Sequence, residues 1–272
     1  MRLAHDYLVV ASPEHRVRAT LDRDAEDFAE RMGYTAGRFA TRDELLAAGE
    51  EEWVRELHGA LRELLVPERR TLSVGSGYGE HEVQLAVAGY RIVATDIVEQ
   101  ALADAARLFP ELETRRFDVL APDPDERWDD ILVASLDYAL DDTELELALR
   151  NCRSLLAPGG RVILVHRYRD TPGTWLIDRV LVPAVAVASR VKTRARIVRR
   201  EHGYRRTGRE LLDLTDRSGL RVARVRSAGY GMELTRVDLH RRAPAVYRLL
   251  QRADRRLRIF NNATVFELIP VA

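Results

Sequence analysis

One segment organises the chain, Thr71-Leu-Ser-Val-Gly-Ser-Gly-Tyr-Gly-Glu80, in which a short apolar run ends in three glycines, Gly75, Gly77 and Gly79. A helix-like pattern follows at 80–88, and a second apolar run at 91–95 ends in Asp96. This order predicts a strand, a tight turn, a helix and a second strand. Glycines let the backbone turn sharply and let a ligand approach it, and an acid about twenty residues after the first glycine is placed to bind ribose hydroxyls. The segment therefore predicts a site for an adenosine-containing cofactor.

The spacing of the glycines distinguishes between two classes of cofactor. A dinucleotide site has the pattern Gly-x-Gly-x-x-Gly, and the position that should hold its third glycine is Glu80. A glutamate there would repel a pyrophosphate, which makes a nicotinamide-dependent reductase the least favoured function. The spacing found here, Gly-x-Gly-x-Gly, resembles the first motif of the class I S-adenosylmethionine-dependent methyltransferases, whose sulfonium cofactor carries no phosphate.

Further landmarks of that family follow in the same order, over residues 70 to 270. They are Arg116-Phe-Asp-Val-Leu120, Trp128-Asp-Asp-Ile-Leu-Val-Ala-Ser135 and Leu155-Leu-Ala-Pro-Gly-Gly-Arg-Val-Ile-Leu-Val165, which resemble the third, fourth and fifth strands. The resemblance implies an α/β fold with a Rossmann-like, seven-stranded, doubly wound sheet that is mostly parallel and has an antiparallel last strand. It also implies an N-terminal helical cap at 1–70 and a cofactor-binding domain at 71–272. Within that domain we expect a helical lid at about 167–206 and a helical insertion at about 240–260.

The resemblance also implies which residues bind S-adenosyl-L-methionine, with S-adenosyl-L-homocysteine as the product. Asp96 would bind the ribose hydroxyls, and Asp118 with the backbone after it would receive the adenine. The family usually carries an acid two residues before the first glycine, whereas this chain has Ser73. The expected cofactor-binding residues are Ser73, Gly75, Gly77, Gly79, Asp96, Ile97, Asp118, Val119 and Ser135.

Two residues near the ends of predicted strands are candidates for catalysis. A hydroxyl acceptor loses its proton as it attacks the methyl group, so we expect a base at this edge of the sheet. Asp137 follows the predicted fourth strand and His166 follows the fifth. Imidazole titrates near neutral pH and suits a base, while a carboxylate can orient it or take the proton itself. The alternative is structural, with His166 bonded to backbone and Asp137 capping a turn.

The composition is that of an ordinary globular protein with no overall attraction to nucleic acid or membrane. The 272 residues are 46% hydrophobic and 32% charged, and their formal net charge is zero. The single cysteine, Cys152, excludes an intramolecular disulfide and a cysteine metal cluster. The sequence shows neither an apolar run long enough to span a bilayer nor the apolar core of a signal peptide, which predicts a cytoplasmic protein without a membrane partner.

Three segments outside the cofactor motifs have more than one interpretation. The arginine-rich run 190–209 could contact an anionic acceptor or RNA, but a solvated face is favoured, so we do not expect a nucleic-acid partner. The basic amphipathic helix predicted at 244–260 could cap the site, pair two subunits in a homodimer or lie on a membrane, and packing on the domain is favoured. Tyr34 and Arg38 could touch the methionine carboxylate of the cofactor or belong to a solvated loop.

A metal ion is the remaining question about the site. Some methyltransferases of this fold bind Mg²⁺ through acids that follow the fourth and fifth strands, and the acids in that region here are Asp137, Asp141, Asp142 and Asp170. Asp141 and Asp142 are better explained as residues at the start of a helix. Mg²⁺ is therefore not favoured, and no metal ligand is assigned.

The sequence thus predicts an S-adenosylmethionine-dependent methyltransferase that methylates a hydroxyl of a small polar acceptor, such as a sugar, a glycan or a specialised metabolite. The preference for oxygen rests on His166 and Asp137. It rests also on the missing Asn/Asp-Pro-Pro-Tyr motif of amino-group methylation on bases. Methylation of nitrogen or carbon in a small molecule, methylation of RNA, and cofactor binding without catalysis, which Ser73 favours, stay open.

Overall fold

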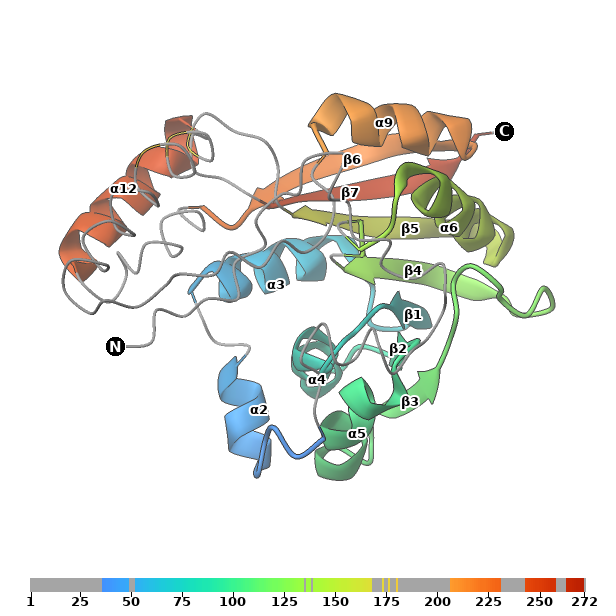
Figure 1. Ribbon diagram of the computed structural model, residues 1–272, viewed down its shortest axis with the longest axis horizontal. Coiled ribbons are helices and arrows are strands. Elements are labelled where there is room, and N and C mark those ends of the chain that lie inside the picture. Colours follow the sequence, from blue (N-terminus) through green and yellow to red (C-terminus); the bar gives the residue numbers. More distant parts are fainter. Residues whose placement is uncertain are drawn as a thin grey trace, which may run out of the picture.

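The computed structural model describes the predicted sheet and most of its helices (Figure 1). It describes residues 36–48, 52–134, 136–137, 139–167, 206–230, 243–257 and 263–271, with the single positions 173, 176 and 180. The first 35 residues of the expected cap, including Tyr34, and most of the lid at 167–206 lie outside these ranges. The elements are α2 (Arg42–Ala48), α3 (Glu52–Leu64), β1 (Thr71–Val74), α4 (Glu80–Val87), β2 (Ile92–Asp96), α5 (Glu99–Leu108), β3 (Glu113–Arg116), β4 (Trp128–Ala134), α6 (Asp142–Ser154), β5 (Leu156–Arg167), α9 (Gly208–Arg217), β6 (Leu220–Ala228), α12 (Pro244–Leu257) and β7 (Ala263–Pro270).

The seven strands form one sheet in the order β3-β2-β1-β4-β5-β7-β6. Strands β1 to β5 pair in parallel, and β7 is antiparallel to both of its neighbours, β5 and β6. The strand order reverses between β1 and β4, which is where open α/β sheets bind their ligands. The predicted fold class is therefore confirmed, including the antiparallel last strand.

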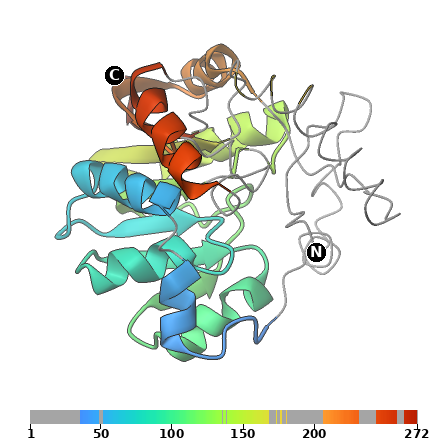
Figure 2. The same cartoon turned by 90° about the vertical axis from the view of Figure 1, so that its left-hand side faces the viewer.

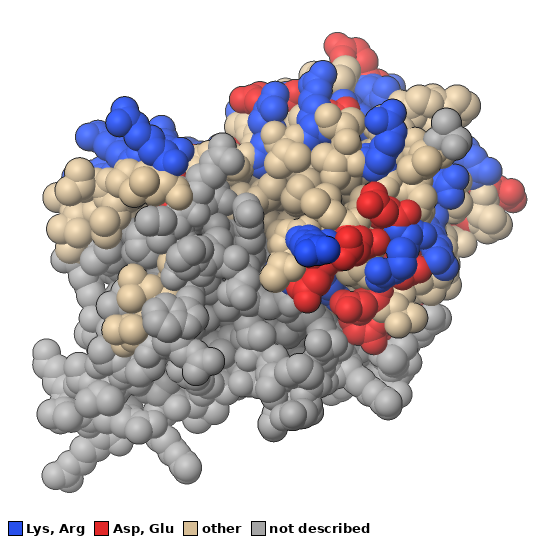
Figure 3. All heavy atoms as spheres, turned by 90° about the horizontal axis from the view of Figure 1, so that it is seen from above, with Lys and Arg blue, Asp and Glu red and all other residues tan. Residues whose placement is uncertain are grey.

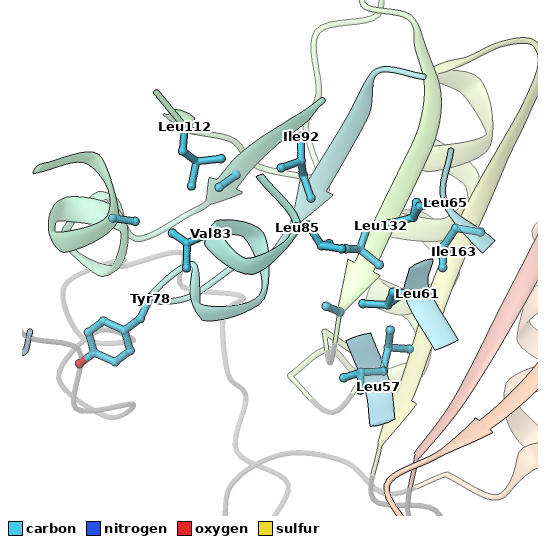
Figure 4. Close-up of a cluster of buried hydrophobic side chains, with 14 of the residues drawn as sticks. Leu57, Leu61, Leu65, Tyr78, Val83, Leu85, Ile92, Leu112, Leu132 and Ile163 are labelled. Atoms are coloured by element: carbon cyan, nitrogen blue, oxygen red, sulfur yellow. The ribbon is translucent and has the colours of Figure 1, made fainter. Parts of the chain in front are cut away.

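Helices cover both faces of the sheet, as a doubly wound fold requires. On one face, apolar side chains of α3, α4 and α5 pack against those of β4 and β5 in a continuous core (Figure 4). Leu57, Leu61 and Leu64 lie on one stripe of α3 and are fully buried in this core, as their spacing predicts. On the other face, α6 and α9 pack against β1, β4, β5 and β7.

Two helices begin with a capping box. The Asp141 side chain accepts a hydrogen bond from the backbone N–H of Glu144, and the Glu144 side chain accepts one from the N–H of Asp141. Thr207 and Glu210 make the same arrangement at the start of α9. Such pairs satisfy backbone donors that have no partner within the helix. Of the two acids expected to start α6, Asp141 is the cap.

The helix expected at 244–260 is α12, and one of its faces is buried. Its buried side chains are Tyr247, Gln251 and Asp254, whereas Leu249 is 67% exposed. The buried face therefore combines an aromatic ring with polar side chains, and packing of the apolar stripe on the domain stays a prediction. The arginines of the helix are exposed, and basic and uncharged side chains lie side by side at the left of Figure 3. The helix lies beyond the end of β5, and Arg255 bonds Glu56 of α3 at 2.9 Å (Figures 1 and 2).

A buried ion cluster joins the amino ends of β4 and β5 to the loop before β1. Asp130 is fully buried and accepts hydrogen bonds from Arg69 at 3.0 Å and from Arg161 at 2.9 Å. Arg161 also bonds Glu267 of β7 at 2.9 Å and the carbonyl oxygen of Leu64, the last residue of α3. Asp130 and Arg161 thus join β4, β5, β7, α3 and the loop before β1, at the edge of the sheet opposite the predicted cofactor site.

Among the described residues, no helix combines the length and the apolar character that crossing a membrane requires.

Candidate cofactor site and active site

The three glycines after β1 form the tight turn that their spacing predicts. Gly75, Gly77 and Gly79 have φ values of 72°, 56° and 74°, a region that residues with a side chain rarely occupy. A Cβ on Gly75 would lie 3.1 Å from the Leu136 side chain, and one on Gly79 would lie 3.1 Å from Ala105. The turn therefore requires glycine for its backbone angles, and at these two positions also for the close approach of neighbouring elements.

Asp96 links the tip of β2 to this turn. Its carboxylate accepts hydrogen bonds from the backbone N–H groups of Gly77 and Val98, both at 2.9 Å. Burial raises the pKa of the Asp96 carboxyl above its ordinary value, and the two N–H groups act in the opposite direction. Each carboxylate oxygen keeps a further lone pair, so Asp96 can hold the turn and still accept a hydrogen bond from a ligand hydroxyl.

The other expected cofactor residues lie along the same edge. Asp118 follows β3, is half-buried and accepts a hydrogen bond from the N–H of Leu120 at 2.9 Å. The carbonyl oxygen of Val119 accepts a hydrogen bond from Asn151 of α6, and Ile97 is half-buried beside Asp96. Ser135 lies outside the described residues.

Ser73 has an acidic partner that the sequence analysis missed. Its hydroxyl donates a hydrogen bond of 2.6 Å to Oε1 of Glu82, the third residue of α4. Both side chains are completely buried, and Oε2 of Glu82 has no hydrogen-bond partner. The signal in the sequence was the missing acid at Ser73 together with acids in the first turn of the following helix.

Asp137 and His166 are brought into direct contact, although 29 positions separate them. Nδ1 of His166 is hydrogen-bonded to Oδ2 of Asp137, and the side chains are 1% and 2% exposed, respectively. Strand β5 continues to Arg167, so His166 lies within the strand and not after it. Nε2 of His166 and Oδ1 of Asp137 are buried without hydrogen-bond partners.

Thr264 is a second residue that the sequence analysis missed. It pairs with His166 across β5 and β7, and its buried hydroxyl also lacks a hydrogen-bond partner. Side chains of directly opposed residues project from the same face of a sheet. Unpaired polar atoms of His166, Asp137 and Thr264 thus gather at one place, a pattern that buried polar groups show where they serve a ligand.

Arg206 holds the loop that carries Asp137. It is buried, donates hydrogen bonds to the carbonyl oxygens of Asp137 and Leu140, and pairs with Asp142 at 2.8 Å. Arg206 belongs to the arginine-rich run 190–209, for which a solvated face was expected. For this arginine that expectation is wrong, and residues 190–205 lie outside the described part of the chain.

The strand register places the glycine turn and His166 at the same edge of the sheet. Val74 of β1 is paired with Val133 of β4, and Ala134 of β4 is paired with Val165 of β5. Gly75 directly follows Val74, and His166 directly follows Val165, so both residues lie at the same level of the sheet. Their strands, β1 and β5, are separated only by β4, which corresponds to roughly 10 Å between strand axes. The Leu136 side chain lies against Gly75 and Asp137 is the next residue, so the loop after β4 links the two groups.

The segment before α2 contacts the same region. The guanidinium of Arg38 lies 4.5 Å from the ring centroid of Tyr78, which belongs to the glycine turn. The backbone N–H groups of Gly37 and Phe39 donate hydrogen bonds to Asp104 of α5.

Within the described ranges, no three His, Cys, Asp or Glu side chains gather as metal ligands, and Asp170 lies outside those ranges.

The family of the site follows from its sequence. Residues 71–160, from β1 into β5, match the model of a family described as a methyltransferase domain. This segment is a methyltransferase domain. The match confirms the resemblance that the glycine motif indicated, and the methyltransferase domain contains the glycine turn, Asp96, Asp118 and Asp137. No curated protein matches the chain in sequence.

Solved methyltransferase structures share the fold. The chain is similar to the pyocyanin biosynthetic protein PhzM, with a TM-score of 0.51 and 21% identity over 80% of this chain and 54% of PhzM. It is also similar to magnesium protoporphyrin IX methyltransferase (ChlM) from Synechocystis PCC 6803 with bound S-adenosylhomocysteine. The TM-score is 0.51, and the identity is 14% over 91% of this chain and 95% of ChlM. A third similar structure is human N-acetylserotonin methyltransferase in complex with S-adenosylmethionine. The TM-score is 0.51, and the identity is 14% over 84% of this chain and 55% of the human protein. The chain thus spans about half the length of PhzM and of the human protein.

Proposed function

We propose that this protein is an S-adenosylmethionine-dependent methyltransferase that methylates a hydroxyl group of a small polar acceptor, such as a sugar, a glycan or a specialised metabolite. The observation that carries the proposal is the buried Asp137–His166 pair at the edge of the sheet where the glycine turn lies. The turn supplies a cofactor cradle, and the pair supplies a base for an acceptor hydroxyl.

The residues at the turn fit S-adenosylmethionine. Asp96 has lone pairs left for the ribose hydroxyls, and Asp118 stands at the tip of the next strand. Glu80 and Glu82 at the start of α4 would repel a diphosphate, whereas a cation is compatible with them. The bound cofactor supplies a methyl group whose bond to the sulfonium sulfur breaks as its bond to the acceptor oxygen forms, and the sulfur keeps the electron pair. The ligands named for ChlM and the human methyltransferase support the same cofactor.

The geometry of the pair supports Nε2 of His166 as the base. A carboxylate can only accept hydrogen bonds, so Nδ1 of His166 carries a proton and donates a hydrogen bond to Asp137. Nε2 is then left with a lone pair that takes the acceptor proton as the new oxygen–carbon bond forms. Asp137 is held by Arg206 and stabilises the imidazolium that results. Transfer to a hydroxyl is the reaction that uses this arrangement most fully.

The acceptor class is inferred from the elements around the site. We infer that residues 1–70 form a cap and that about 167–206 form a lid on the domain 71–272, and that the acceptor lies between them and His166. The stacking of Arg38 on Tyr78 supports a cap that reaches the glycine turn. The names of ChlM and of the human methyltransferase indicate small-molecule acceptors for those proteins.

An activity screen tests the proposal. The purified protein is incubated with S-adenosylmethionine labelled on the methyl group, and with fractions of small molecules or glycans extracted from the source cell. We expect label in a product whose methyl group is released only by conditions that cleave ethers or esters. Label in RNA or in amino groups, or cofactor binding without any transfer, would contradict the proposal.

Replacing the first glycine should weaken cofactor binding. In Gly75→Ala the new Cβ meets Leu136 at 3.1 Å and the backbone keeps a φ of 72°, so the turn must shift. We expect affinity for S-adenosylmethionine to fall about tenfold or more, equivalent to ~1.4 kcal/mol, measured by isothermal titration calorimetry.

A second glycine separates backbone strain from damage to the site. Gly159 also has a positive φ, 74°, but has no atom within 4 Å of its expected Cβ. Gly159→Ala should lower stability by about 1–2 kcal/mol while leaving cofactor affinity unchanged. Equal losses of affinity in the two variants would show that the turn is not the cofactor site.

A further inference from the structure

The Glu82 carboxylate occupies an unusual position directly behind the glycine turn. It belongs to the first turn of α4, three residues after Gly79, and its Oε1 accepts the hydrogen bond from Ser73 of β1. Ser73 is two residues before Gly75. The carboxylate is thus placed between the strand that enters the turn and the helix that leaves it, and no part of it is exposed.

This carboxylate lacks a counter-charge. The Ser73 hydroxyl is a neutral partner for Oε1, and Oε2 has no hydrogen-bond partner. The pKa of Glu82 is raised to about 7, mainly by burial and to a smaller extent by the nearby Glu80, while the Ser73 and Ser76 hydroxyls act in the opposite direction. A buried acid without a cation costs folding free energy, so a group of this kind calls for an explanation, and a ligand that completes it is one.

A cationic ligand is what this environment lacks. S-adenosylmethionine carries two positive groups, the sulfonium and the α-ammonium group of its methionine end. The adenosine end is accounted for by Asp96 and Asp118 at the tips of β2 and β3, so the methionine end lies toward β1 and the turn. Building on the proposed function, we propose that Glu82 supplies the carboxylate that binds the α-ammonium group, from helix α4, in place of an acid at Ser73 on the strand.

The substitution Glu82→Gln tests this, because glutamine keeps the shape and the hydrogen bond with Ser73 but removes the charge. We expect affinity for S-adenosylmethionine to fall at least tenfold in isothermal titration calorimetry. Affinity for S-adenosylhomocysteine, which keeps the ammonium group and has a neutral sulfur, should fall by the same factor. Affinity for 5′-methylthioadenosine, which lacks the amino-acid end, should stay unchanged.

Proton exchange gives an independent readout. With the raised pKa, Glu82 of the free protein is partly protonated near pH 7, and an ammonium group favours its charged form. Binding of S-adenosylmethionine at pH 7 should therefore release a fraction of a proton, seen as a dependence of the binding enthalpy on the ionisation enthalpy of the buffer. Glu82→Gln should abolish that release. Glu80→Gln removes a charge that helps to raise the pKa of Glu82, so it should keep the affinity and reduce the release without abolishing it.

Moving the acid provides a rescue. The double variant Ser73→Asp, Glu82→Ser exchanges the positions of hydroxyl and carboxylate, and it should recover most of the affinity that Glu82→Gln loses. Circular dichroism and melting temperature check that each variant is folded.

The outcomes separate the two proposals. Failure of the unaltered protein to bind S-adenosylmethionine would overturn the proposed function. Binding by the unaltered protein, with Glu82→Gln binding S-adenosylmethionine equally well, would overturn only the role of Glu82. An equal loss of affinity for 5′-methylthioadenosine would also overturn it, because it would show that Glu82 supports the turn and not the methionine end.

Discussion

His166→Gln should reduce methyl transfer by about 10²–10⁴-fold while leaving affinity for S-adenosylmethionine unchanged. The variant removes the Nε2 lone pair that accepts the proton but leaves the glycine turn and Asp96 untouched. Transfer is measured with labelled cofactor and the acceptor found in the activity screen, and affinity by calorimetry. Turnover equal to that of the unaltered protein would remove His166 from the mechanism.

Two companion variants make this result specific. Asp137→Asn keeps the shape of the orienting side chain but offers His166 an amide in place of a carboxylate, so turnover should fall for want of a correctly oriented base. His58 is the matched control, because it is a buried histidine on α3 that contacts His81 and not the site. His58→Gln should leave turnover at saturating substrate within about twofold, since it removes no group that exchanges a proton with the acceptor.

The second large effect concerns stability. Asp130→Ala should lower the free energy of unfolding by about 3–5 kcal/mol, because it leaves Arg161 and Arg69 without their shared carboxylate in a largely buried place. Urea denaturation measures the change, and the slope of the transition should stay the same if both forms unfold in one step.

An exposed ion pair of the same kind is the control for Asp130. Arg42 and Glu111 pair across α2 and the loop after α5, with side chains that are 49% and 51% exposed. Glu111→Ala should cost less than about 1 kcal/mol, because water screens and replaces such a contact. A similar cost for Asp130→Ala would mean that the buried cluster does not hold the sheet and α3 together.

Much of the cofactor half of the site could be predicted from the sequence, because local chemistry fixes it. Positive φ angles require glycine, and a strand followed by an acid places that acid at the edge of a parallel sheet. The second, fourth and fifth strands were therefore predicted to within two residues, whereas β3 ends at Arg116, where the segment expected to be the third strand begins. Asp96 lies where its position in the chain indicates. Asp141 as the cap of α6 followed from the same kind of local rule.

The groups that the sequence did not reveal depend on contacts between distant segments. Glu82 looked like an ordinary acid at a helix start, and only the packing of α4 on β1 shows it against Ser73. Arg206 looked like one of many arginines, but its partners are 64 to 69 positions away. Asp137 and His166 were named separately, and their contact depends on the register of β4 and β5. Thr264 became visible only through the pairing of β7 with β5.

Arg206 has a consequence for how the acceptor could change during evolution. The chain leaves the sheet just after His166 and returns to the described fold at Arg206, which is fastened to the backbone of Asp137. Both ends of the segment 168–205 are thus anchored at the Asp137–His166 pair. We expect changes in the sequence or length of this segment to alter the selectivity for the acceptor without displacing Asp137 or His166. Orthologues should therefore diverge most in this segment.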